Sequence, residues 1–191
     1  MSRIEPVEVK GPFLRASRAI GRRQYGREMT SLGVWGHHPR LLRAYVLHDR
    51  AVEKDDRVPR RLKALAVLEA AAVVGCEFCV DIGSEYARRA GLTDEQLLAL
   101  PRARESGRFS EEELLVIDYA AAMSRTPPEV TDAMVERLTA RLGEKGVFEL
   151  TMAIAWENLR ARVNAALDVE PEGFSEGKVC VVPERMAATS G

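Results

Sequence analysis

The sequence is poor in aromatic side chains and in cysteine, and it has no excess of charge of either sign. Aromatic residues make up 6% of the 191 residues, and there are 3 cysteines. Lys and Arg number 28 against 29 Asp and Glu, which leaves a formal net charge of −1. This balance argues against nucleic acid or an anionic membrane surface as a partner.

Long hydrophobic runs are also missing. The longest apolar stretch, residues 64–75, is interrupted by Glu69 and is shorter than the roughly 20 residues that a membrane-spanning helix needs. Residues 1–10 mix charged residues with single apolar ones and lack the apolar segment of a signal peptide. We therefore expect a cytoplasmic protein with no membrane partner, in a compartment where a persistent structural disulfide is unusual.

Helical patterns cover most of the chain, and no segment alternates apolar and polar residues as a half-buried strand does. The stretch 61–74 follows Pro59 and is apolar nearly all round, so it is expected to be the buried central helix. Residues 93–96 and 110–113 have the capping-box pattern of a helix start. The other helices are predicted after Pro39, between Gly75 and Gly91, from residue 131 to near 143, and from about 144 to 167.

These patterns predict a single domain of the all-α class. Residues 37–168 are expected to form the helical domain, with an N-terminal extension over 1–36 and a C-terminal extension over 169–191. The C-terminal extension contains glycine and proline but also Phe174, Val179 and Val181, which predict an ordered strap.

Two of the three cysteines, Cys76 and Cys79, form a Cys-x-x-Cys pair just after Gly75. The change of pattern at Gly75 places both thiols in the first turn of the following helix, where free backbone N–H groups and the helix dipole favour an anion. A reactive cysteine needs such an environment, because the thiolate is the nucleophile. The pair therefore points to thiol redox chemistry.

Several residues are candidate neighbours of this pair. Gly83 and Tyr86 follow Cys79 by one and two helical turns, so the three share a face on which a cleft could open. Glu69 stands two turns before Cys76 in a very apolar helix and needs a partner, a raised pKa or a function. Asp81 is a further candidate, although its position two residues after Cys79 places it on nearly the opposite face of the helix.

Structural interpretations stay open for each of these residues. The two cysteines could be buried packing residues, Glu69 could pair with Arg160 or Arg162, and Tyr86 could be a core aromatic residue. A zinc site would need two ligands more, and no ligand spacing is present, so we expect no metal and no cofactor. The side chains that could supply them are Cys180, His37, His38 and His48. For Cys180, burial in the core is favoured over a role as an additional resolving thiol.

The sequence also resembles the carboxymuconolactone decarboxylase/alkylhydroperoxidase D family, in particular the subgroup with Cys-x-x-Cys-x-Asp-x-Gly. The resemblance extends over residues 39–183, and Gly75 followed by the cysteine pair makes it specific. The segments that carry it are 62–68, 75–79, 91–96, 110–113, 118–120, 157–164 and 173–180.

The resemblance implies an all-α alkylhydroperoxidase D-like bundle that assembles into trimers, hexamers or other homo-oligomers. It also implies an oxidoreductase that reduces hydroperoxides: Cys79 attacks the peroxide, Cys76 resolves the sulfenic acid to a disulfide, and an external dithiol regenerates the pair. Glu69, Asp81 and Tyr86 are the remaining candidate catalytic residues.

Two positions depart from the hydroperoxidase motif. Gly83 stands where the motif has a histidine, four residues after the second cysteine, and Ala64 stands where it has a glutamate. Loss of a general base costs about 10²–10⁴-fold in rate, so weak peroxidase activity or a different thiol reaction is expected. Two alternatives stay open: a non-redox decarboxylase or isomerase that uses Glu69, Asp81 or His37 as a proton donor, and a helical assembly protein with inert cysteines.

Overall fold

A computed structural model describes residues 2–8, 11, 15–16, 18–19, 22–23, 29, 31–54, 57–175 and 177. Within these residues all regular elements are helices and there is no strand, which confirms the predicted all-α class. The elements are α2 (Ser31–Trp35), α3 (Pro39–Lys54), α4 (Arg60–Val74), α5 (Glu77–Arg89), α6 (Asp94–Ala99), the 3-10 helix η1 (Leu100–Arg102), α7 (Ala103–Ser106), α8 (Glu111–Ser124) and α9 (Asp132–Ala166).

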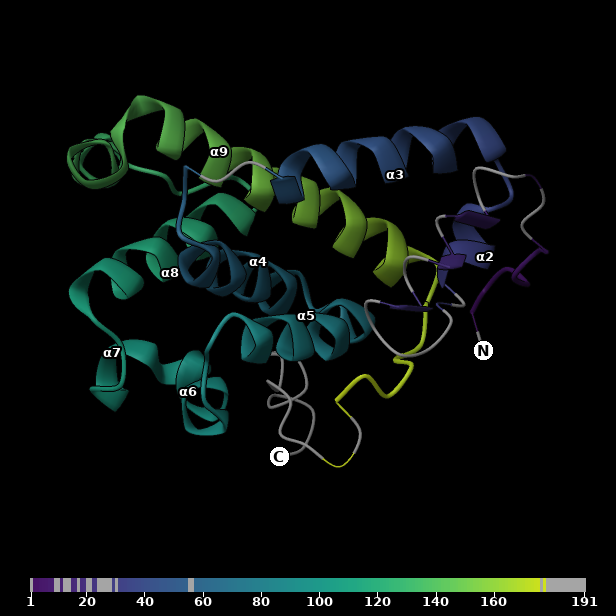
Figure 1. Cartoon of the computed structure of the whole chain (residues 1–191). Coiled ribbons are helices and arrows are strands. Elements are labelled where there is room, and N and C mark those ends of the chain that lie inside the picture. Colours follow the sequence, from purple (N-terminus) through teal and green to yellow (C-terminus); the bar gives the residue numbers. More distant parts are fainter. Residues whose placement is uncertain are drawn as a thin grey trace.

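Helix α4 is the centre of the bundle, as its apolar sequence predicts. It packs against α5, α8 and α9, and α3 lies along α9 on the other side of the molecule from α6 and α7 (Figure 1). Leu65, Ala66 and Leu68 of α4 are fully buried. The helix ends at Gly75, whose φ of 76° lies in the left-handed region that favours glycine, and the chain turns there into α5.

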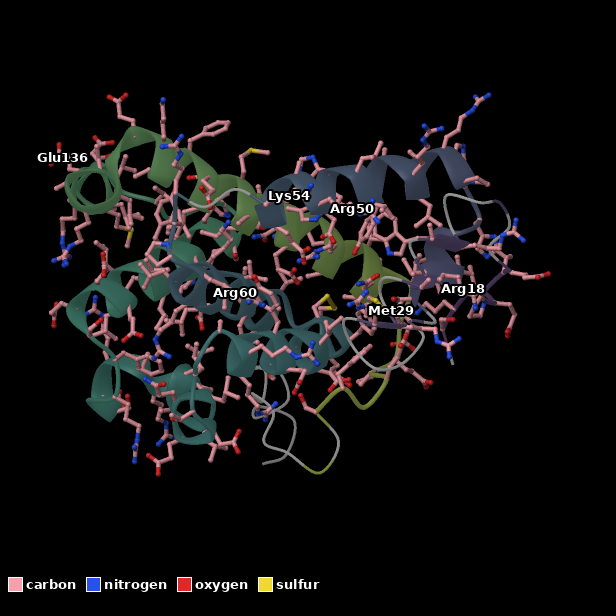
Figure 2. The ribbon with its side chains drawn as sticks, in the orientation of Figure 1. Arg18, Met29, Arg50, Lys54, Arg60 and Glu136 are labelled. Atoms are coloured by element: carbon pink, nitrogen blue, oxygen red, sulfur yellow. A yellow bond between two sulfur atoms is a disulfide. The ribbon has the colours of Figure 1, made fainter. Side chains whose placement is uncertain are left out.

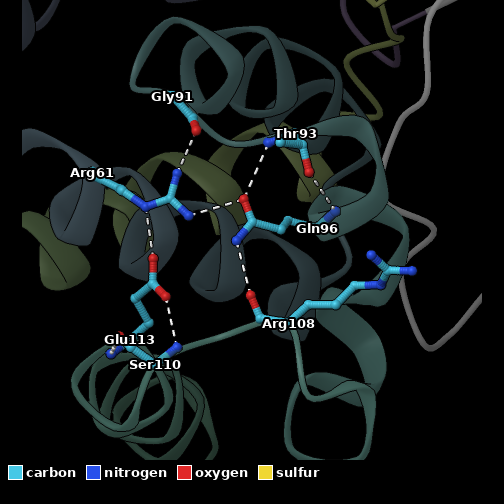
Figure 3. Close-up of polar contacts among 7 residues, drawn as sticks. All are labelled: Arg61, Gly91, Thr93, Gln96, Arg108, Ser110 and Glu113. Carbon is cyan, nitrogen blue, oxygen red and sulfur yellow. Dashed lines mark hydrogen bonds and ion pairs between the residues drawn. The ribbon is translucent and has the colours of Figure 1, made fainter.

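Both predicted capping boxes are present, and one arginine joins them. Thr93 caps α6 with Gln96, and Ser110 caps α8 with Glu113. Figure 3 shows Arg61 of α4 between the two caps, with Nε donating to Glu113 Oε1 at 2.6 Å and Nη2 donating to Gln96 Oε1 at 2.9 Å. Burial alone would raise the pKa of Glu113, but hydrogen bonds from Ser110 and Arg61 hold this pKa below its ordinary value.

Two features depart from or refine the predicted helix order. The 3-10 helix η1, which contains Pro101, and the short helix α7 follow α6, where the sequence pattern predicted only the end of a helix. The predicted break between the last two helices is confirmed as a kink inside α9, where Gly143 has the non-helical angles φ 67° and ψ 168°. None of the helices described is long and apolar enough to span a bilayer. The division into a core and two extensions stays a prediction.

Candidate functional site

The cysteine pair lies at the start of α5, buried in the bundle. Cys76 is the N-cap residue of the helix, and its sulfur accepts a hydrogen bond from the backbone N–H of Cys79 at 3.2 Å. The two sulfurs are joined as a disulfide, with Cα atoms 5.2 Å apart. The exposed fractions of Cys76 and Cys79 are 2% and 5%. The predicted position of both thiols at a helix start is confirmed.

A cavity of about 220 Å³ opens beside the pair, with walls from α3, α4, α5 and α9. Cys79, Gly83 and Tyr86 all line it, whereas Cys76 does not. The wall is mainly apolar and aromatic: Leu32, Tyr45, Val46, Val52, Val67, Phe78, Ile82, Ala153 and Trp156 contribute to it. Met29 and Arg50, which are labelled in Figure 2, complete it from the segment before α2 and from α3.

Asn164 of α9 contacts the reactive end of the cavity. Its Nδ2 donates to Cys79 Sγ at 3.5 Å, and its Oδ1 accepts a hydrogen bond from Trp35 Nε1 at 3.1 Å. The indole N–H can only donate, so it fixes the orientation of the amide and leaves the N–H₂ group for the sulfur. This arrangement suits a thiolate, because a hydrogen bond donated to sulfur stabilises its charged form.

A second polar group consists of Glu157 and Arg160, which precede Asn164 on α9, and Asp49 of α3, and all three line the cavity. Arg160 Nη1 donates to Asp49 Oδ1 at 2.7 Å, and Nη2 donates to Glu157 Oε2. Trp156 Nε1 donates to the same Asp49 oxygen at 2.9 Å. We call Asp49, Glu157 and Arg160 the carboxylate cluster.

Burial dominates the electrostatics of this cluster. It raises the pKa of Glu157, against the opposing effect of Arg160. Partial desolvation and the neighbouring Asp49 likewise raise the pKa of Glu53, which also lines the cavity although much of the residue is exposed to solvent. The pKa of Tyr45 is also raised, mainly by burial. The cavity therefore has carboxyl groups whose protons are held more tightly than in water.

The structure does not bring Glu69 and Asp81 to the cavity wall. Glu69 is half-buried on α4, which contributes Lys63 and Val67 to the wall instead. Asp81 is 5% exposed, and its carboxylate accepts hydrogen bonds from three backbone N–H groups of the segment after α9. It thus holds the start of the predicted C-terminal strap, whose Phe174 packs edge-on against Phe78 with ring centroids 6.3 Å apart.

The histidine candidates do not line the cavity themselves. The His37 ring contacts the Glu5 carbonyl at 2.8 Å, and the His48 ring lies tilted by 47° against Trp156 with centroids 4.3 Å apart. No cluster of three or more potential metal ligands occurs within the described part of the chain. Cys180 lies outside the described residues.

Sequence reasoning missed the carboxylate cluster and Asn164 as site residues. A signal was present, since Glu157, Arg160 and Asn164 are spaced i, i+3 and i+7 and must share one face of a helix. Asp49 and Glu53 are likewise one turn apart. On α3, however, that spacing also fits an ordinary solvent-facing stripe.

The geometry defines an all-α protein with a buried Cys-x-x-Cys pair beside a small-molecule cavity. The model of the "Carboxymuconolactone decarboxylase family" matches residues 39–122. The uncharacterized protein YnjA of Escherichia coli (strain K12) is 36% identical over 175 residues, or 91% of this chain and 93% of that protein. The chain therefore belongs to the carboxymuconolactone decarboxylase family, as its motifs predicted.

Solved structures share the fold at low sequence identity. A variant of the debrominase Bmp8 in complex with 2,3,4-tribromopyrrole has a TM-score of 0.80 at 20% identity, over 90% of this chain and 92% of that chain. The alkylhydroperoxidase AhpD core of a peroxidase-related protein from Ralstonia eutropha has a TM-score of 0.78 at 17% identity, over 94% and 97%. These structures confirm the predicted alkylhydroperoxidase D-like bundle.

Proposed function

We propose that this protein is a thiol-dependent peroxidase that reduces hydroperoxides through Cys79 and Cys76. The observation that carries the proposal is the buried pair at the start of α5, where Cys79 lines the cavity and Cys76 lies within bonding distance of its sulfur. The fold shared with a peroxidase-related alkylhydroperoxidase core supports it.

The chemistry balances with these two thiols and an external dithiol. The Cys79 thiolate attacks the outer oxygen of the hydroperoxide, the O–O bond breaks, and the departing alkoxide takes up a proton to become an alcohol. Cys79 is thereby oxidised to a sulfenic acid. The Cys76 thiol attacks that sulfur, water leaves and the disulfide forms, after which the dithiol reduces the pair by exchange and is itself oxidised.

Local structure supports these roles. The start of α5 offers free N–H groups and the positive end of the helix dipole to the thiolate, and Asn164 donates to its sulfur. Gly83 lines the cavity one turn after Cys79, and a Cβ built there would crowd Leu68 Cδ1 at 3.2 Å. Tyr86 extends the same wall one turn further along α5. We infer a homo-oligomer from the family resemblance.

Single-turnover oxidation tests the proposal. Reduced wild-type protein should rapidly lose two thiols per chain when mixed with one equivalent of cumene hydroperoxide. Over the same time, Cys79→Ser should lose no thiols. Cys76→Ser should instead accumulate a sulfenic acid on Cys79 that dimedone traps, because the resolving thiol is gone. Peroxide consumption by Cys79→Ser at the wild-type rate would exclude the assigned roles.

Reductive removal of bromine is a second candidate, favoured by the apolar wall and by the fold shared with a debrominase. Here Cys79 would bond to bromine while the ring carbon keeps the electron pair of the C–Br bond and takes up a proton. Cys76 would then displace bromide as the disulfide forms. Bromide release from 2,3,4-tribromopyrrole, measured with the same dithiol that supports peroxide reduction, separates the two reactions.

A further inference from the structure

Glu157 has a buried oxygen that the bundle leaves without a hydrogen bond. The side chain is 3% exposed and lines the cavity. Oε2 accepts from Arg160, but Oε1 has no partner among the described residues. A buried carboxylate oxygen without a partner is costly, so this atom is a position where a ligand would gain a hydrogen bond.

The chemistry of Oε1 selects the ligand group. A carboxylate oxygen accepts hydrogen bonds, and the pKa of Glu157 is raised because burial leaves the charge poorly solvated. An O–H or N–H group that donates to Oε1 would supply the missing solvation. The cations Arg160 and Lys63 of the same wall are already paired, Arg160 with Asp49 and Glu157 and Lys63 with Glu149. A carboxylate or phosphate ligand at Oε1 would therefore meet the like charge of Glu157, so a neutral donor fits better.

The cavity limits the size and shape of the ligand. Its volume of about 220 Å³ exceeds the roughly 150 Å³ of a dry engineered cavity that holds benzene, so one ring with small substituents fits. Glu157 lies two turns before Asn164, which contacts Cys79, so the two ends are separated by roughly 10 Å along the helix axis. This separation suits an elongated monocyclic molecule.

We propose that the cavity binds a small, mostly apolar monocyclic molecule whose O–H or N–H group donates to Glu157 Oε1, so that the opposite end of the molecule faces Cys79. This inference rests on the proposed function in taking Cys79 as the reacting group. It adds a specificity determinant on α9, remote from the cysteine pair. Arg160 positions the carboxylate by donating to its other oxygen, and Asp49 accepts a second hydrogen bond from Arg160.

The two tryptophans provide a binding assay that needs no turnover. The chain has 2 Trp residues, and their indole N–H groups bond to the two polar ends of the cavity, Trp156 to Asp49 and Trp35 to Asn164. Their ¹H–¹⁵N signals can be followed in the oxidised full-length protein as p-cresol or 4-methylanisole is added. The two probes have similar shape, but only p-cresol can donate a hydrogen bond.

We expect wild-type protein to bind p-cresol about tenfold more tightly than 4-methylanisole, as befits one hydrogen bond to a charged group. In Glu157→Gln the amide oxygen faces Arg160 and the N–H₂ group faces the cavity, so the preference should fall below about threefold. Glu157→Asp, which keeps the charge but withdraws the oxygen, should weaken p-cresol binding alone. Glu53→Gln, the same change elsewhere in the wall, should keep the preference.

Equal affinity for both probes in the wild type, no binding of either up to their solubility, or a preference that survives Glu157→Gln would overturn the inference. So would loss of the preference in Glu53→Gln alone. The assay uses the oxidised pair without reductant, so it is independent of the thiol count that tests peroxidase activity. Failure of one experiment therefore leaves the other interpretable.

Discussion

Removal of the Asp81 carboxylate should release the segment that follows α9. Asp81 Oδ2 accepts from the backbone N–H groups of Glu172 at 3.1 Å and Phe174 at 2.9 Å, and Oδ1 accepts from Ser175 at 2.7 Å. In Asp81→Ala all three donors lose their acceptor. If the segment stayed in place, each buried N–H would cost about 1–3 kcal/mol.

Detachment of the segment that follows α9 costs less free energy than keeping it in place with three unpaired N–H groups. It returns the three N–H groups to water and exposes the Phe174 ring, which is 7% exposed in the fold and whose burial is worth about 1.5–3 kcal/mol. Some of the segment's conformational entropy is recovered as well. We therefore expect Asp81→Ala to lower the free energy of unfolding by about 2–4 kcal/mol, which is less than three orphaned donors would cost together.

Urea unfolding followed by circular dichroism gives the free energy, and cleavage by a glutamate-specific protease after Glu172 reports the detached segment. The matched control is Asp94→Ala, because Asp94 is 54% exposed and pairs with Arg88 near the surface, so its loss should cost less than about 1 kcal/mol. The reasoning fails if Asp81→Ala unfolds like the wild type and its cleavage rate is unchanged.

Two further predictions concern the thiol site and the capping network. Asn164→Ala removes the hydrogen bond donated to Cys79 Sγ, so iodoacetamide should alkylate Cys79 of the reduced protein about tenfold more slowly. Asn158→Ala, on the same helix, should leave that rate unchanged. Because the pKa of Glu113 is lower in the folded than in the unfolded chain, its carboxylate stabilises the fold above its ordinary pKa of 4.5, and this contribution disappears as the pH falls through the folded pKa. Glu113→Gln should therefore be less stable than the wild type at neutral pH but should lose less stability on acidification, measured by urea unfolding across this range.

Local signals in the sequence predicted much of the fold. The capping boxes at Thr93 and Ser110 depend on residues three positions apart, so the residues of a single helical turn determine whether each box forms. The left-handed conformation of Gly75 and the helix start at Cys76 are local in the same sense. These features place the thiols correctly without knowledge of how the helices pack.

The cavity could not be predicted in this way, because its polar end joins residues distant in sequence. Asp49 and Arg160 are separated by 111 positions and meet only because α3 lies along α9. The sequence also does not show which charged residues become buried, since Asp49 looks like part of a solvated face but is half-buried against α9. Periodicity indicates which residues share a face but not what that face meets.

The contrast between Glu69 and Glu157 shows what packing adds. Both are carboxylates in apolar helical surroundings, and the sequence favoured Glu69 because it precedes the cysteines in the central helix. The face of α4 that reaches the cavity carries Lys63 and Val67, and Glu69 lies off that face. Glu157 is instead turned into the cavity by the same helical face that brings Asn164 to Cys79. A helix that supports the thiol at one end thus presents an acceptor at the other, so the reacting sulfur and the oxygen that we assign to recognition are held at a fixed separation by the backbone of α9.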